Sequence, residues 1–204
     1  AGYDVRGMSG FFERLQQSTR LYENNATAYL RTHPLTGERL SDMQNREQPV
    51  AYRQVADSAD FQLVRARARA LQGRPVDAVR DFEALLRDKK YSSEAATRYG
   101  LAVALARKGD WAAAEKELQA VRKLKMSGPM VDRLLAEVKI AQGEREAGLL
   151  LYREAMVRYP LNLALLYGYG SALIGEKKFA EALRFADEQL RNYPQDARFY
   201  RMRA

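Results

Sequence analysis

The sequence of 204 residues contains no cysteine, a single histidine and a single tryptophan. The absence of cysteine excludes disulfides, thiolate metal sites and a cysteine nucleophile, but it indicates no compartment. One imidazole, that of His33, does not hold zinc firmly, because catalytic zinc sites use three protein ligands. We therefore expect no cofactor in this chain alone.

Long apolar runs are also missing. No stretch approaches 18 uncharged apolar residues, so the sequence predicts no transmembrane segment. The N-terminus, AGYDVRGMSGFF, lacks the basic region and apolar run of a signal peptide. A mature protein or an excised fragment would already have lost its signal peptide. No nucleophile–base pair or metal constellation is visible, so the sequence does not favour an enzyme.

Charge is distributed unevenly along the chain. Residues 1–57 hold seven basic and seven acidic side chains, so the net charge of +8 comes from residues 58–204, with 27 basic and 19 acidic. Such an excess suits acidic proteins, an anionic lipid surface or nucleic acid, or is simply a solvated surface. Because the basic residues are dispersed and no recognition module accompanies them, we do not expect nucleic acid binding.

A repeat of about 34 residues dominates the sequence from Ala59 onward. Its copies read RARARALQGRPVDAVRDF around Gly73, LAVALARKGDWAAAEKEL around Gly109, LAEVKIAQGEREAGLLLY around Gly143 and GYGSALIGEKKFAEALRF around Lys177. A unit of this length cannot bury its own apolar face, so neighbouring units must stack. The repeat therefore predicts that the function of this chain depends on a binding surface.

Each copy indicates two antiparallel helices joined by a glycine turn. A small residue in the first helix marks close approach of a neighbour, and a second small residue follows the turn. Glycine ends the first helix because a left-handed conformation penalises a β-carbon. The small residues are Ala66, Ala102, Ala136 and Gly170 in the first helices and Ala78, Ala114, Gly148 and Ala182 in the second; the turns hold Gly73, Gly109 and Gly143, with Gly175 two residues early in the last copy.

This pattern, with aromatic Trp111 and Phe179 and two closing Tyr-Pro pairs, resembles the tetratricopeptide (TPR) repeat more than a pentatricopeptide array. The resemblance implies an all-α, right-handed superhelix of about four helical hairpins, preceded by two or three non-repeat helices. The spacings of 36, 34 and 34 residues place two extra residues near Lys89–Ser92. The expected repeats are 59–94, 95–128, 129–162 and 163–196, with a partial cap at 197–204.

In TPR arrays the first helix of each pair lines a concave groove. Tyrosine and arginine are the side chains that most often dominate binding energy, and both occur on this face. For each tyrosine, packing between repeats is the alternative to a binding role. The lysines and asparagines with which TPR domains clamp a C-terminal carboxylate are absent. The predicted groove residues are Arg67, Tyr99, Val103, Arg133, Glu137, Tyr167 and Ser171.

Residues 1–57 do not follow the repeat. An amphipathic helix is predicted from Met8 to about Glu23, with Ser9 as a plausible N-cap. Pro34 suits the first turn of a second helix running to about Arg46, with Thr32 or His33 as its cap.

Two stretches of this segment, AGYDVRGMSGFFERL and YLRTHPLTGERLSDMQNR, resemble the tail of the peptidase domain in BepA-type zinc metalloproteases. These bacterial envelope enzymes carry a C-terminal TPR region. Their metal-binding HExxH helix precedes the AGYD segment, and this chain contains no HExxH. The resemblance therefore implies that zinc belongs to a catalytic domain outside this chain.

The same resemblance implies a periplasmic location and a module that recruits proteins or extended peptides, among them outer-membrane β-barrel proteins and their assembly machinery. A freestanding TPR scaffold unrelated to proteolysis is the alternative. His33 lies in the THP turn; it either caps the following helix or reaches the metal or substrate in the complete enzyme. Zinc affinity and peptidase rate of the complete enzyme with His33→Ala distinguish the two.

Overall fold

A computed structural model describes residues 6–19, 41–42, 44–46 and 56–204 of the chain. The chain divides into two compact units, Ala1–Asp57 and Ser58–Ala204. All regular secondary structure in the described residues is helical. Within these ranges, no helix combines the length and apolar character needed to cross a membrane.

The first unit contains helix α1, Arg6–Thr19. Because α1 begins at Arg6, Ser9 lies inside the helix and is buried, so the prediction that Ser9 is the N-cap was wrong. Residues 41–42 and 44–46 are helical and fall within the predicted second helix. His33, with the rest of the THP turn, lies outside the described residues.

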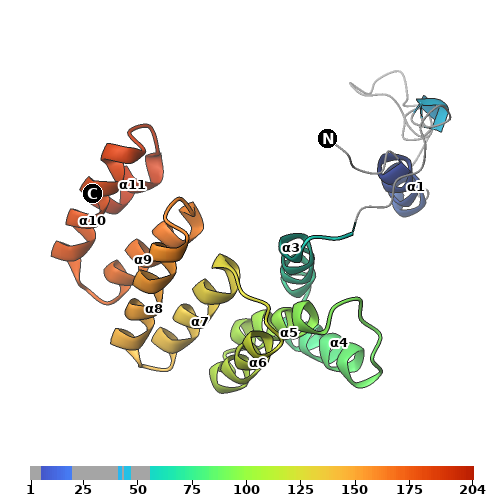
Figure 1. Cartoon of the computed structure of the whole chain (residues 1–204), viewed down its shortest axis with the longest axis horizontal. Coiled ribbons are helices and arrows are strands. Elements are labelled where there is room, and N and C mark those ends of the chain that lie inside the picture. Colours follow the sequence, from blue (N-terminus) through green and yellow to red (C-terminus); the bar gives the residue numbers. More distant parts are fainter. Residues whose placement is uncertain (1–5, 20–40, 43, 47–55) are drawn as a thin grey trace. The chain divides into compact units, whose positions relative to one another are not determined.

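The second unit is a series of helical hairpins (Figure 1). Four helices form the first members of the pairs: α3 (Ala59–Ala70), α5 (Glu94–Lys108), α7 (Pro129–Ala141) and α9 (Leu163–Gly175). Their partners are α4 (Pro75–Arg87), α6 (Trp111–Lys123), α8 (Arg145–Arg158) and α10 (Phe179–Asn192). A shorter helix, α11 (Ala197–Arg203), follows.

Local sequence explains where these helices begin. Ser58, Ser93, Asp110 and Asn162 each accept a hydrogen bond from a backbone N–H in the first turn of the following helix, which satisfies a donor that otherwise lacks an intrahelical partner. Pro129 opens α7, where its missing N–H costs nothing.

The turns between paired helices need a left-handed residue. Gly109 adopts this conformation with φ of 87°, as Gly73 and Gly143 do in their turns. In the last hairpin Gly175 is the final residue of α9, and Lys177 instead takes the left-handed position with φ of 58°. The array thus places a lysine where a β-carbon is penalised.

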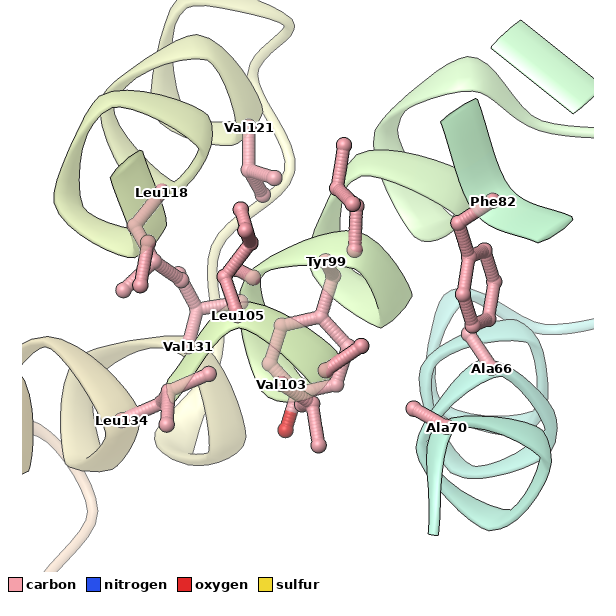
Figure 2. Close-up of a cluster of buried hydrophobic side chains, with 14 of the residues drawn as sticks. Ala66, Ala70, Phe82, Tyr99, Val103, Leu105, Leu118, Val121, Val131 and Leu134 are labelled. Atoms are coloured by element: carbon pink, nitrogen blue, oxygen red, sulfur yellow. The ribbon is translucent and has the colours of Figure 1, made fainter. Parts of the chain in front are cut away.

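Successive first helices pack side by side, α3 on α5, α5 on α7, α7 on α9 and α9 on α11. Each of α3, α5, α7 and α9 also contacts its own hairpin partner. Helix α5 is the most extensively packed of the first helices, because α3, α4 and α6 all make broad contacts with it and α7 adds a smaller one. Its alanine-rich sequence leaves most of its residues buried. Figure 2 shows Tyr99, Val103 and Leu105 of this helix among side chains of its neighbours.

Small residues allow the helices to approach closely. A β-carbon added at Gly148 would lie 2.5 Å from Cγ1 of Ile140, and one at Gly170 would lie 2.2 Å from Sδ of Met202. Both contacts are shorter than van der Waals separation, so a side chain at either position would displace its neighbour. The small residues in the repeat therefore mark inter-helix contacts.

Candidate functional site: a groove along the first helices

Three adjoining hollows follow the first helices from α3 to α11, and together we call them the first-helix groove. The Tyr99 hollow, about 250 Å³, is lined by Arg67, Tyr99, Pro129, Met130, Arg133, Leu134, Glu137, Asn162 and Ala164. The central pocket, about 740 Å³, is lined by Arg133, Glu137, Ile140, Ala141, Tyr152, Leu163, Ala164, Tyr167, Gly168, Ser171, Ala172 and Arg198. The α11 hollow, about 360 Å³, is lined by Tyr167, Ser171, Ile174, Arg198, Arg201 and Met202.

Neighbouring hollows adjoin one another, because they share lining residues. Arg133, Glu137 and Ala164 line both the Tyr99 hollow and the central pocket. Tyr167 and Ser171 line both the central pocket and the α11 hollow. In the pairs Arg133/Glu137 and Tyr167/Ser171 the residues are four positions apart, which puts both members on one face of their helix. A ligand that follows these faces crosses successive repeats.

The Tyr99 hollow combines a charged wall with a buried hydroxyl. Tyr99 is fully buried, and its hydroxyl oxygen has no hydrogen-bond partner within the described part of the chain. Burial raises the pKa of Tyr99, while the nearby Arg67 opposes this shift through its charge and through donation toward the hydroxyl oxygen. The hydroxyl is therefore a protonated, unsatisfied donor at neutral pH.

The central pocket has a largely apolar lining with one ion pair at its edge. Nε of Arg133 donates to Oε1 of Glu137 at 2.8 Å. Burial works against the charge of Arg133, but the Glu137 carboxylate outweighs it and the pKa of Arg133 is raised. Tyr152, from α8, is buried beneath the pocket, and burial raises its pKa well above the usual range. The pocket thus offers apolar surface bounded by a cation.

At the α11 end, Tyr167 joins the groove to the terminal helix. Its hydroxyl donates to Oδ2 of Asp196, and the guanidinium of Arg198 lies 3.8 Å from its ring centroid. Phe199 packs on the same ring, with centroids 4.7 Å apart. Burial, with the hydrogen bond to Asp196, raises the pKa of Tyr167 to about 12. Tyr167 is therefore both a groove residue and a packing residue.

The charge of the groove is positive. Arg133 is paired with Glu137, and Arg198 with Asp196. Among the described residues, Arg67 and Arg201 make no ion pair. One unpaired guanidinium thus lines the hollow at each end, and the field of the groove favours an acidic ligand.

The predicted groove residues are distributed unequally. All of them except Val103 line one of the three hollows. However, Tyr99 and Val103 are both buried, because α3, α4, α6 and α7 enclose α5. Both therefore pack in the core, and of the two only Tyr99 also lines a hollow. Arg67, Arg133, Glu137, Tyr167 and Ser171 form the accessible part of the predicted set.

The structure adds residues that were not predicted, notably Ile140, Tyr152, Arg198 and Arg201. Arg201 could have been found, since the 34-residue period places it at the position equivalent to Tyr167. Arg198 lines the central pocket because α11 packs against α9. The sequence does not predict this packing.

Within the part of the chain that the structure describes, no group of three or more histidine, cysteine or acidic side chains could hold a metal ion.

The structure is that of a helical repeat protein. Its evidence is the paired helices, the small residues at their close contacts and the groove along the first helices. The family model for the tetratricopeptide repeat matches residues 63–129 and 133–197, and this chain belongs to that family. The prediction of an all-α TPR array is confirmed.

One curated relative and one solved structure extend the comparison. The chain is 23% identical over 197 residues to the beta-barrel assembly-enhancing protease of Yersinia pestis, covering 96% of this chain and 40% of that protein. The predicted resemblance to the TPR region of BepA-type proteases is thereby supported. The solved structure of PilW, a type IV pilus biogenesis factor, shares the fold with a TM-score of 0.61 and 15% identity, covering 98% of this chain and 91% of that one.

Proposed function

We propose that this chain is the protein-interaction region of a bacterial cell-envelope zinc metalloprotease, and that its groove recruits or positions proteins in the quality control of outer-membrane β-barrel proteins. The first-helix groove, with its positive charge and apolar central pocket, is the observation that carries the binding role. The Yersinia pestis relative, whose name gives it a role in β-barrel assembly, supports the proteolytic context.

The proposal assigns catalysis to residues outside this chain. The chain spans about 40% of the length of that relative, and the AGYD and THP segments resemble the end of a peptidase domain. The zinc ligands and the general base of an HExxH helix would then precede Ala1, and residues 58–204 would supply affinity without chemistry. A periplasmic location follows from the same resemblance.

The gene upstream of Ala1 provides the direct test. An HExxH motif behind a secretion signal supports the proposal. An initiator methionine close to Ala1, with no peptidase domain, would overturn it in favour of a freestanding TPR scaffold. Purified full-length protein should then degrade a model unfolded polypeptide with zinc, and chelation should abolish that activity.

A further inference from the structure

The Tyr99 hollow contains donors but lacks an available acceptor. Arg67 has no ion-pair partner among the described residues; it acts on the buried Tyr99 hydroxyl, and within the described part of the chain that hydroxyl donates to no acceptor. An unsatisfied buried donor costs free energy, so a structure that retains one invites an explanation. The single carboxylate in the lining, that of Glu137, is held by Arg133 at 2.8 Å.

A carboxylate is the ligand group that fits this arrangement. It offers two acceptor oxygens, and guanidinium groups bind it through charge-assisted hydrogen bonds stronger than neutral ones. The hollow of about 250 Å³ has room for an acidic side chain. The half-buried Arg67 lines the same hollow as Tyr99 and acts on its hydroxyl, so a carboxylate bound to Arg67 would lie near that hydroxyl.

The adjoining central pocket requires a different side chain. It is about three times larger, and Ile140, Leu163 and Ala172 give it apolar walls. The two hollows share Arg133, Glu137 and Ala164, so they lie side by side. Because an extended chain advances roughly 3.3 Å per residue, side chains that fill both hollows are separated by only a few residues.

We propose that the first-helix groove binds an extended polypeptide segment in which an acidic side chain, seated between Arg67 and Tyr99, lies one to three residues from a large apolar side chain in the central pocket. This inference rests on the proposed binding function and names the chemistry of the bound segment. The positive charge of the groove complements such a ligand, and the unpaired Arg201 at the far end favours further acidic residues beyond the apolar one.

Fluorescence anisotropy with short labelled Gly/Ser peptides tests the proposal on the full chain. Each peptide carries one Glu and one Phe, separated by one to three residues, in both orders. We expect at least one arrangement to bind, with about tenfold loss when Glu is replaced by Gln and a comparable loss when Phe is replaced by Ala.

Three variants of the chain test which residues cause the preference for the Glu peptide over the Gln peptide. Arg67→Gln should remove the preference for Glu over Gln. Tyr99→Phe should reduce that preference about threefold while the melting temperature stays equal or rises, because the ring remains and the unsatisfied hydroxyl is lost. Arg69→Gln removes the same charge from α3 at a residue that lines none of the three groove hollows, and it should leave the preference unchanged.

Three results would overturn the inference. The first is equal affinity for the Glu and Gln peptides, the second is loss of the preference in Arg69→Gln as in Arg67→Gln, and the third is no binding by any peptide of the set. If affinity depends on Phe but not on Glu, the groove still binds polypeptides and only the acidic subsite fails. A chain that binds no peptide but still cross-links a partner through the groove in cells retains the proposed function without this chemistry.

Discussion

Tyr99 and Tyr167 occupy equivalent positions in α5 and α9 but have different surroundings. Tyr99 is fully buried within α5 and its neighbours, whereas Tyr167 is half-buried beside the central pocket. The difference arises because the neighbours of α5 pack more extensively against it than those of α9 do. Equivalent residues in a repeat can thus serve the core in one unit and the surface in another.

Replacing Tyr99 with alanine should lower the free energy of unfolding by about 3–5 kcal/mol, as for other large buried aromatic residues. Tyr200 is about half exposed, at 49%, and Tyr200→Ala should cost less than about 1 kcal/mol. Urea denaturation followed by circular dichroism measures both values. Similar losses for the two variants would show that Tyr99 is not a core residue.

The left-handed lysine in the last hairpin is a second effect at the scale of one residue. Lys177 is exposed, with φ of 58°, so Lys177→Gly should raise the free energy of unfolding by about 1 kcal/mol. Lys116 is exposed within α6, and Lys116→Gly should instead lower it by about 1 kcal/mol. The opposite signs, measured by the same denaturation, separate backbone strain from loss of a lysine side chain; matching signs would refute the assignment.

At the scale of the element, α11 is held to α9 by a small polar cluster. Asp196 caps α11 and accepts hydrogen bonds from Tyr167 and Arg198. These bonds hold the pKa of Asp196 well below its usual range, with the Arg198 side chain as the largest cause. The carboxylate form therefore stabilises the docked helix.

Asp196→Asn should weaken the docking of α11, and its effect should depend on pH. Because the folded-state pKa is lowered, the contribution of Asp196 is complete above its unfolded pKa of about 3.9. It is lost progressively as the pH falls below that value toward the folded pKa. The difference between wild type and variant should thus be large at pH 7 and smaller at pH 3, by urea denaturation. A pH-independent difference would contradict this account.

A second charged cluster joins three helices near the middle of the array. Asp132 of α7 is 2% exposed, and its carboxylate lies 2.9 Å from Nη2 of Arg122 in α6 and 3.2 Å from Nη2 of Arg158 in α8. A buried carboxylate needs such partners because desolvation is costly. Asp132 therefore fixes α7 between the helices on either side of it.

Asp132→Asn should lower the free energy of unfolding by about 1–2 kcal/mol, less than for a fully buried pair because both arginines reach solvent. Asp77 pairs with Arg74 and Arg80 at the exposed start of α4, and Asp77→Asn should have a smaller effect. Thermal and urea denaturation provide the comparison. Equal effects of the two substitutions would show that burial of Asp132 contributes nothing.

The sequence predicted the helical pairs and their turns well because the repeat imposes the same packing in every unit. The sequence prediction failed at two positions where a local motif indicated a helix boundary that the structure places elsewhere. Ser9 resembles an N-cap, but α1 starts earlier. Gly175 resembles a turn glycine, but its helix extends through it and Lys177 turns the chain.

At the scale of the whole repeat unit, the groove is a product of stacking. No single hairpin forms the central pocket, since its lining comes from α7, α8, α9 and α11. The sequence could predict which face of each first helix borders the groove, because that face follows helical spacing. It could not predict that Tyr99 and Val103 are covered or that Arg198 reaches the pocket, because both depend on how neighbouring helices pack.

Site-specific photo-cross-linking in the full-length protein, expressed in its own host, tests the binding role of the groove most directly. A photoreactive residue at Ser171, which is exposed within the groove, should cross-link an outer-membrane β-barrel protein or a component of its assembly machinery. The same residue at Ala147, exposed on α8 and outside the groove lining, should not. Cross-links from Ala147 to that partner with none from Ser171 would contradict the account.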